Sequence, residues 1–313
     1  MEWMNFLVGM GCLLSIYGII AVAYNVQYGY TKMVNFGTVA WFAIGAYAYA
    51  ILTTHPPLPE DTYRFGFGFP ILVGIIGAGI ISGLVAFLIG LPTLKLKGHY
   101  FAIVTFAFAE ILRHMLINEK WLTNGTVGFF ALRRPWVNLM SANAYTYFSF
   151  FLMVVALLLT YFLLNKICKA PFGRVLKGIR ENDTVCLFLG KKVPSFKMKA
   201  FVITSIFMGI AGSLYASMYM TLVTPSMFTS MVSFLVLFAV VVGGKGNNKG
   251  AILGMFLLIF ADQFTRFIEV PTSFAVRMSS IRGIIYGLIL VMVLRFLPRG
   301  IIKEKKVIYH EGR

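Results

Sequence analysis

Two pairs of opposite charges lie inside long apolar stretches of the sequence. Glu110 precedes Arg113 by three residues and Asp262 precedes Arg266 by four, and both spacings place the two members on one face of a helix. A charge at the centre of a bilayer costs about 2.5–3.5 kcal/mol on insertion scales, so such groups pair with one another, face a cavity, or do both. The pairs therefore predict either structural ion pairs or a water-lined path for a zwitterion.

A second polar cluster lies where the first two apolar stretches meet, and it consists of Asn25, Gln27, Tyr28 and Asn35. Amide side chains beside interrupted helices are a common lining for a transport path. The same amides can also cap the ends of two helices. The residues alone leave both interpretations open.

The basic stretch 166–199 has the pattern of an ordered element rather than of a slack linker. Asn182 or Asp183 can cap the start of a short helix, and Gly190 can end it in a left-handed conformation. A short amphipathic helix outside the membrane either lies on the lipid surface or docks on another protein. The apolar and charged residues that mark this helix are Arg174, Lys177, Arg180, Glu181, Val185, Leu187, Phe188, Leu189, Lys191 and Lys192.

No catalytic residue is predicted. A phosphate-binding loop follows GxxxxGK[ST], and in the nearest stretch, VGGKGNNKG, neither Lys245 nor Lys249 precedes a hydroxyl. We interpret this stretch as a glycine-rich turn between two helices. Glu181 and Asp183 lie among basic residues, which favours surface ion pairs over an acid–base pair. The three cysteines lack metal-ligand spacing, so we expect free thiols, no metal and no cofactor in this chain.

Membrane helices must position these groups. Of 313 residues, 59% are hydrophobic and 12% are charged, whereas an ordinary soluble domain carries about 25% charge. Apolar runs near the roughly 20 residues that cross a bilayer predict an all-α bundle of about nine spans, with eight to ten as the range. The expected spans are Met4–Tyr24, Phe36–Leu52, Ile71–Leu91, Tyr100–Ile117, Phe148–Leu164, Ala200–Met220, Met227–Val242, Ala251–Phe267 and Ile281–Leu297.

The placement of Lys and Arg predicts the orientation. With the N-terminus outside, most of the 28 Lys and Arg residues fall in cytoplasmic connections, as the positive-inside rule requires. The formal charge of +17 then reflects topology and attraction to anionic lipid rather than nucleic-acid binding. The first apolar stretch has no Lys or Arg before it and no cleavage pattern after it, so we expect a span and not a signal peptide.

Small residues recur four apart along the expected spans, as in Gly79 with Gly83, Gly209 with Ser213, and Gly250 with Gly254. Such pairs let membrane helices approach closely. We expect them to mark packing contacts within one domain, 1–313, that carries the 166–199 segment and a basic cytoplasmic tail, 298–313.

Several sequence blocks carry a family resemblance. PFGRVLKGIREND is followed by Gly190, by AFVITSIFMGIAGSLYA and by VVGGKGNNKGAILG. Earlier in the chain come NVQYGYTKMVNFGTVAWFAIGAY, LPTLKLKGHYFAIVTFAFAEILR and LTNGTVGF. In this order, over most of residues 24–256, the blocks resemble the permease subunits of bacterial ABC importers of the branched-chain amino acid class.

The resemblance implies that the helix near Glu181 to Gly190 is a coupling helix, which docks in a groove of a separate ATPase subunit. It also implies two such subunits that bind ATP and Mg, a second related permease, an extracytoplasmic binding protein that meets the face carrying TNGTVG, and a multi-pass location in a prokaryotic inner membrane. Val185 and Cys186 stand where the family commonly has small alanines, so the details of docking differ.

The sequence thus predicts half of the translocation pathway for branched-chain amino acids or a similar small polar solute. Permeases for urea or short-chain amides have a very similar pattern, and the solute is left open between them. A secondary transporter or channel that works without ATP is the rival from another class. That rival would use Glu110 or Asp262 as its ion carrier but has no use for the 181–190 helix.

Overall fold

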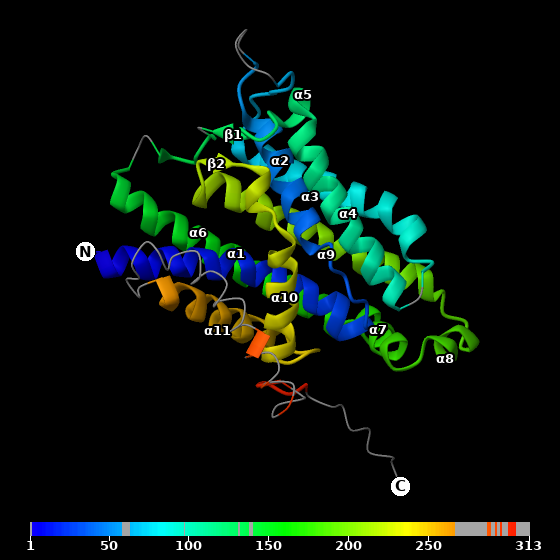
Figure 1. The fold of residues 1–313 in the computed structure, drawn as a ribbon. Coiled ribbons are helices and arrows are strands. Elements are labelled where there is room, and N and C mark those ends of the chain that lie inside the picture. The colour runs from blue at the N-terminus through cyan, green and yellow to red at the C-terminus, as the bar shows by residue number, and fades with distance from the viewer. Residues whose placement is uncertain are drawn as a thin grey trace.

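The computed structural model describes residues 2–57, 63–96, 98–130, 132–137 and 140–266, and also positions 287–288, 292, 295 and 300–304. These residues form a bundle of helices with one short pair of strands (Figure 1). The elements are α1 (Glu2–Thr31), α2 (Thr38–Thr53), α3 (Ile71–Thr93), α4 (His99–Asn118), α5 (Lys120–Thr123), β1 (Phe129–Phe130), α6 (Ala142–Lys169), α7 (Pro171–Glu181), α8 (Asp183–Phe188), α9 (Val193–Leu214), the π-turn η2 (Tyr215–Tyr219), β2 (Leu222–Val223), η3 (Pro225–Met227), α10 (Ser230–Gly243) and α11 (Asn248–Arg266).

The predicted all-α membrane class is confirmed. Among the described residues, six helices are long and apolar enough to cross a membrane, and α2, with 16 residues, is a shorter apolar helix. The count of about nine spans and the outward N-terminus stay predictions. Most of the ninth expected span, 281–297, lies outside the described residues.

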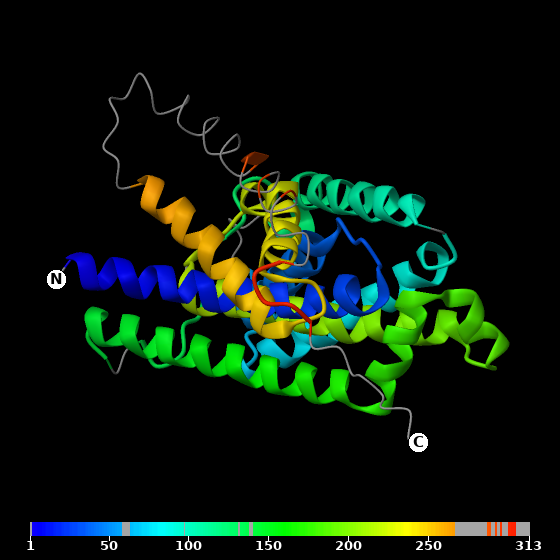
Figure 2. The ribbon, with the colours of Figure 1, turned by 90° about the horizontal axis from the view of Figure 1, so that it is seen from below.

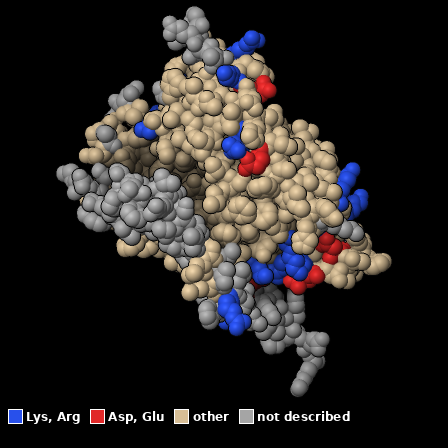
Figure 3. Space-filling model, viewed as in Figure 1, with Lys and Arg blue, Asp and Glu red and all other residues tan. Residues whose placement is uncertain are grey.

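The long helices pack around α1 and α9. Helix α1 lies between α6 and α11 (Figure 2), and α9 packs along both α2 and α3. The surface seen in Figure 3 is mostly uncharged, and many of its Lys and Arg residues gather toward the edge where α7 and α8 lie. An apolar belt with charge near one end is the surface that a bilayer requires.

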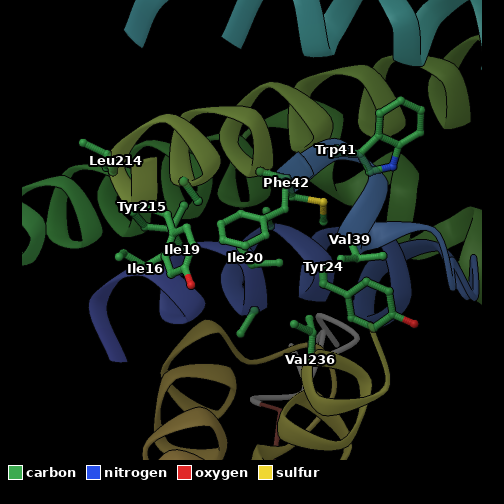
Figure 4. Packing of buried hydrophobic residues seen from close by; sticks show 14 of the residues in the cluster. Ile16, Ile19, Ile20, Tyr24, Val39, Trp41, Phe42, Leu214, Tyr215 and Val236 are labelled. Carbon is green, nitrogen blue, oxygen red and sulfur yellow. The ribbon is translucent and has the colours of Figure 1, made fainter. Parts of the chain in front are cut away.

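Helix α2 forms the centre of the core although it has only 16 residues. Phe42 packs between α1 and the C-terminal end of α9, with a ring centroid 5.3 Å from that of Tyr215 (Figure 4). A Cβ at Gly45 would lie 2.0 Å from the carbonyl oxygen of Gly209. The two backbones therefore touch, which is how van der Waals packing associates helices in lipid.

The predicted small-residue contacts are confirmed in the described helices. Gly79 and Gly83 of α3 face isoleucines of α9, and Gly209 of α9 faces Ser82 of α3. Gly254 of α11 lies against the backbone of Ala239 in α10. These contacts explain why the pairs α3–α9 and α10–α11 pack closely.

Three expected spans had wrong boundaries. Helix α1 continues to Thr31 instead of ending at Tyr24, so Asn25, Gln27 and Tyr28 lie within a helix and only Asn35 lies between two. Helix α6 runs from Ala142 to Lys169, and α9 begins at Val193. The segment 166–199 therefore includes the ends of two long helices. Apolarity ends before a helix does, because polar residues in the last turns still make helical hydrogen bonds.

The strand pair was not predicted. β1 and β2 are antiparallel, with Phe129 opposite Val223 and Phe130 opposite Leu222. The turn expected at TNGTVG precedes β1: Asn124, Gly125 and Gly128 all have positive φ. A Cβ at Gly128 would lie 2.1 Å from the Val223 carbonyl oxygen, so the strands meet only because this residue is glycine.

Candidate functional site

Helix α7 is fixed against the bundle by one buried face. Pro171 is at its first turn, where a missing N–H costs no hydrogen bond. Its buried residues, Gly173, Leu176 and Ile179, are three residues apart along the chain. A Cβ at Gly173 would lie 1.9 Å from the carbonyl oxygen of Cys168 in α6. Arg174 is on the exposed side. The helix therefore provides a rigid base for the segment that follows.

The short helix predicted near 181–190 is present as α8. Asn182 is its N-cap, and the side-chain oxygen accepts hydrogen bonds from the backbone N–H groups of Thr184 (2.9 Å) and Val185 (3.2 Å). Gly190 has a φ of +75° beyond the end of the helix, as the left-handed termination predicts. The two alternatives for the cap are thus resolved in favour of Asn182.

One side of α8 is anchored and the other is free. Cys186 is buried and packs in a small cluster with Ile179 and Val193. The remaining apolar side chains point away from the bundle, and Phe188 is 87% exposed. The other three exposed apolar side chains of this patch are those of Val185, Leu187 and Leu189. Contiguous exposed apolar groups outside the spans mark a contact surface, and we call these four residues the α8 patch.

Ion pairs hold the charged residues of this segment. Lys197 of α9 pairs with Asp183, and Arg180 pairs with Glu181 at 2.9 Å. Burial opposes the charged form of Arg180, but the carboxylates of Glu304 and Glu181 outweigh it and raise the pKa of Arg180 above its ordinary value. Glu181 and Asp183 are therefore salt-bridged groups, as predicted, and each pairs with a base.

A cavity of about 260 Å³ opens beside α8. It lies between the α7–α8 segment and two connections, the one that joins α1 to α2 and the one that joins α3 to α4. Its lining is mixed, with apolar and charged residues, and consists of Thr31, Lys32, Met33, Val34, Leu94, Leu96, Gly98, Phe101, Ile179, Arg180, Glu181, Asp183 and Lys197. The segment therefore has open space on one side.

The intramembrane pair Glu110–Arg113 is formed. Arg113 Nε lies 3.0 Å from a Glu110 carboxylate oxygen, and Ser230 at the start of α10 donates to the other oxygen. The Arg113 and Glu110 side chains are 28% and 31% exposed. Asp262 is half-buried on α11, and the side chain of Arg266 lies outside the part that the structure describes. The first pair thus links α4 to α10.

The amide cluster forms a buried network. Gln27 donates to Thr204 Oγ1 of α9 and accepts from Asn35 Nδ2 at 2.9 Å. Asn25 donates to Asn248 Oδ1 at 2.7 Å and accepts from the backbone N–H of Gly246 at 2.9 Å. Both amides are fully buried.

These bonds tie α1 to α9 and to the α10–α11 turn. Tyr28 stands apart from them and stacks on Tyr24, with ring centroids 6.0 Å apart.

Several contact residues could not be predicted from the sequence. Thr204, Ser230 and Asn248 complete the polar networks, and Glu304 pairs with Arg180. Each lies more than 100 residues from its partner, so no local pattern indicates it. The free thiols are as predicted: Cys12, Cys168 and Cys186 are unpaired and buried.

Comparison with known proteins identifies a family that matches this chain. Residues 7–294 match the family described as "Branched-chain amino acid transport system / permease component". The chain is 31% identical to the "High-affinity branched-chain amino acid transport system permease protein LivM" of Escherichia coli K12 over 281 residues. The protein of the same name in Salmonella typhimurium is 30% identical. Both alignments cover 83% of this chain and 63% of the relative, so the chain spans less than two thirds of these relatives' length.

A third relative matches over nearly its whole length. The "Probable branched-chain amino acid transport permease protein LivM" of Methanocaldococcus jannaschii is 25% identical over 325 residues, which cover 94% of this chain and 92% of that protein. No solved structure gives a significant match. With the apolar helices, these matches show a multi-pass inner-membrane protein. The chain belongs to the family of permease components of branched-chain amino acid transport systems.

Proposed function

We propose that this permease forms half of the translocation pathway of a binding-protein-dependent importer driven by ATP hydrolysis in partner subunits. The partners are two ATPase subunits that bind ATP and Mg, a second, related permease and an extracytoplasmic solute-binding protein. The solute is a branched-chain amino acid or a similar small polar molecule. The names of the relatives support this class of solute.

The α8 patch carries the proposal. Its exposed apolar side chains stand on a frame that Cys186, the Asn182 cap and the Asp183–Lys197 pair hold in place. A short helix that presents apolar anchors from a rigid base is suited to a groove on another protein. A transporter that works without ATP has no need of this surface.

Movement of α8 reaches the pathway through the elements that support it. Helix α7 packs against both α1 and α9, and α9 packs along α2 in the centre of the bundle. When two ATPases close on ATP, they displace the docked helices, and the spans reorient as rigid bodies between inward-open and outward-open states.

The groups that face the solute are proposed from their chemistry. Glu110 and Arg113 offer opposite charges in a partly buried position, which suits the ammonium and carboxylate of a zwitterion. Asp262 and Arg266 form the second proposed pair. The amides Asn25, Gln27 and Asn35 are proposed to shape the path near the centre through the network that fixes the end of α1. Tyr28, which stacks on Tyr24 beside this network, is proposed to contribute to the same path.

Replacement of the docking anchors tests the proposal. The double variant Leu187→Glu/Phe188→Glu should insert normally, because both side chains are exposed, but should lose the ATPase subunits during purification in mild detergent. Charged groups at the centre of an apolar contact reduce affinity by roughly 100-fold or more.

Phe65→Glu/Phe67→Glu is the matched control, because these are also two exposed apolar residues but lie in the connection between α2 and α3. This variant should retain the ATPases. A Leu187→Glu/Phe188→Glu variant that keeps its ATPases and transports normally would mean that docking occurs elsewhere. Wild-type protein that purifies without ATPases yet transports the solute would favour the ATP-independent transporter.

A further inference from the structure

Residues 300–304 lie against the bundle and pair with the end of α10. The backbone N–H of Ile301 donates to the carbonyl oxygen of Val242 at 3.0 Å, and that of Ile302 donates to Gly243 at 2.9 Å. Asn247 donates from its side chain to the carbonyl oxygen of Lys303 at 3.2 Å. The last carbonyls of a helix lack partners within it, and here this segment supplies them.

The next residue reaches across to α7. The Glu304 carboxylate lies 2.7 Å from Arg180 Nη1 and 2.6 Å from Lys177 Nζ. Lys177 and Arg180 are three residues apart and so share one face of α7. The Arg180 and Glu304 side chains are 18% and 21% exposed, so solvent screens this contact less than an open surface pair.

Arg180 also contacts the end of α1. The same guanidinium nitrogen donates to the carbonyl oxygen of Gly29 at 2.7 Å. At Gly29 a Cβ would lie 2.4 Å from the backbone nitrogen of Gly246, so α1 touches the α10–α11 turn there. One group of contacts therefore joins α7, α1, the α10–α11 turn and residues 300–304, which we call the tail segment.

This group includes the segment that carries the α8 patch. Helix α7 ends at Glu181 and α8 begins at Asp183, with only the cap residue Asn182 between them. The contact of Glu304 with α7 therefore restrains α8 relative to α10 and α11. Without the carboxylate, Lys177 loses its ion-pair partner, and Arg180 keeps the Gly29 carbonyl oxygen and the exposed Glu181 carboxylate.

We propose that Glu304 is a positioning residue for energy coupling. Together with Lys177 and Arg180 it forms a clamp that transmits displacement of the α7–α8 segment to α10 and α11. The inference rests on the proposed function, because it assumes that a partner ATPase displaces α8. It adds that the tail segment is part of the transmission and not only a basic anchor.

The test is the number of solute molecules moved per ATP hydrolysed by the whole importer in proteoliposomes. Glu304→Gln should retain the ATPase subunits and hydrolyse ATP with an unchanged KM. Its transport per ATP should fall by roughly three- to ten-fold, the range expected when a partly buried ion pair is lost. Lys303→Gln is the matched control, because it changes the neighbouring charge and keeps the clamp, and it should behave as wild type.

A second comparison separates the clamp from a general effect on the fold. Lys177→Gln/Glu304→Gln should be no worse than Glu304→Gln alone, because Glu304→Gln has already broken the Lys177–Glu304 ion pair. Equal transport per ATP in wild type and Glu304→Gln, or effects of the two single changes that simply multiply, would overturn the clamp. Wild-type complex without ATP-dependent transport would overturn the proposed function instead.

Discussion

At the scale of single residues, each acid of the candidate site that the structure describes on α4, α7 and α8 is held by a partner. Glu110 is bonded to both Arg113 and Ser230, and the α7–α8 acids pair with Arg180 and Lys197. A group that loses its partner in a low-dielectric site costs more than the pair contributes. Variants of these residues therefore test roles only when single and double changes are compared.

For the pair on α4, we expect the double variant Glu110→Gln/Arg113→Gln to be milder than either single variant. Each single change leaves one charge unpaired, which should lower the free energy of unfolding by about 1–3 kcal/mol. Thermal unfolding in detergent measures this effect. Equal loss of transport in single and double variants, with unchanged stability, would instead assign the pair to the solute path.

At this scale, the sequence predicted some residues of the candidate site and missed others. The cap, the left-handed Gly190 and the Arg180–Glu181 pair followed from local rules, because each involves neighbours along the chain. The pairing of Asp183 followed from the many basic residues around it, although its partner Lys197 is 14 residues away. The inward direction of Cys186 did not, since a six-residue helix is too short for a periodic pattern. Glu304 could not be found, because its partner Arg180 lies 124 residues away.

At the scale of elements, apolar length predicted where helices lie but not where they end. Helix α1 extends beyond its apolar run because Asn25 and Gln27 bond to α11 and α9, and these partners satisfy amides that would otherwise be costly to bury. The strand pair was missed because two-residue strands carry no alternating pattern. The four-residue spacing of small residues did predict which helices touch, since small residues in lipid-embedded helices mark close contacts.

The contact between α2 and α9 provides the test at this scale. Gly45→Val should lower the free energy of unfolding by about 1–3 kcal/mol or more, the cost of overpacking, because no room exists beside the Gly209 backbone. Gly9→Ala in α1 is the matched control, because no atom lies within 4 Å of the added carbon. Unfolding midpoints in detergent compare the two, and equal midpoints would contradict the packing described for α2.

At the scale of the whole molecule, polar contacts connect elements that are distant in sequence into one frame. Arg180 reaches Gly29 across 151 residues, and Asn25 reaches Asn248 across 223. Both contacts lie where α1, α7 and the α10–α11 turn meet. The bundle can therefore pass a displacement of α7 to helices on both sides of α1, which is what an energy-coupled permease requires.

Photo-cross-linking from position 188 in native membranes tests the central claim, that the α8 patch docks on an ATPase. A photoreactive phenylalanine in place of Phe188 keeps the aromatic side chain, and the same replacement at Phe162 of α6, which is also exposed, is the control. We expect mass spectrometry to identify an ATPase subunit joined to position 188 and lipid joined to position 162. Lipid adducts alone at position 188, in membranes that still import the solute, would contradict the account.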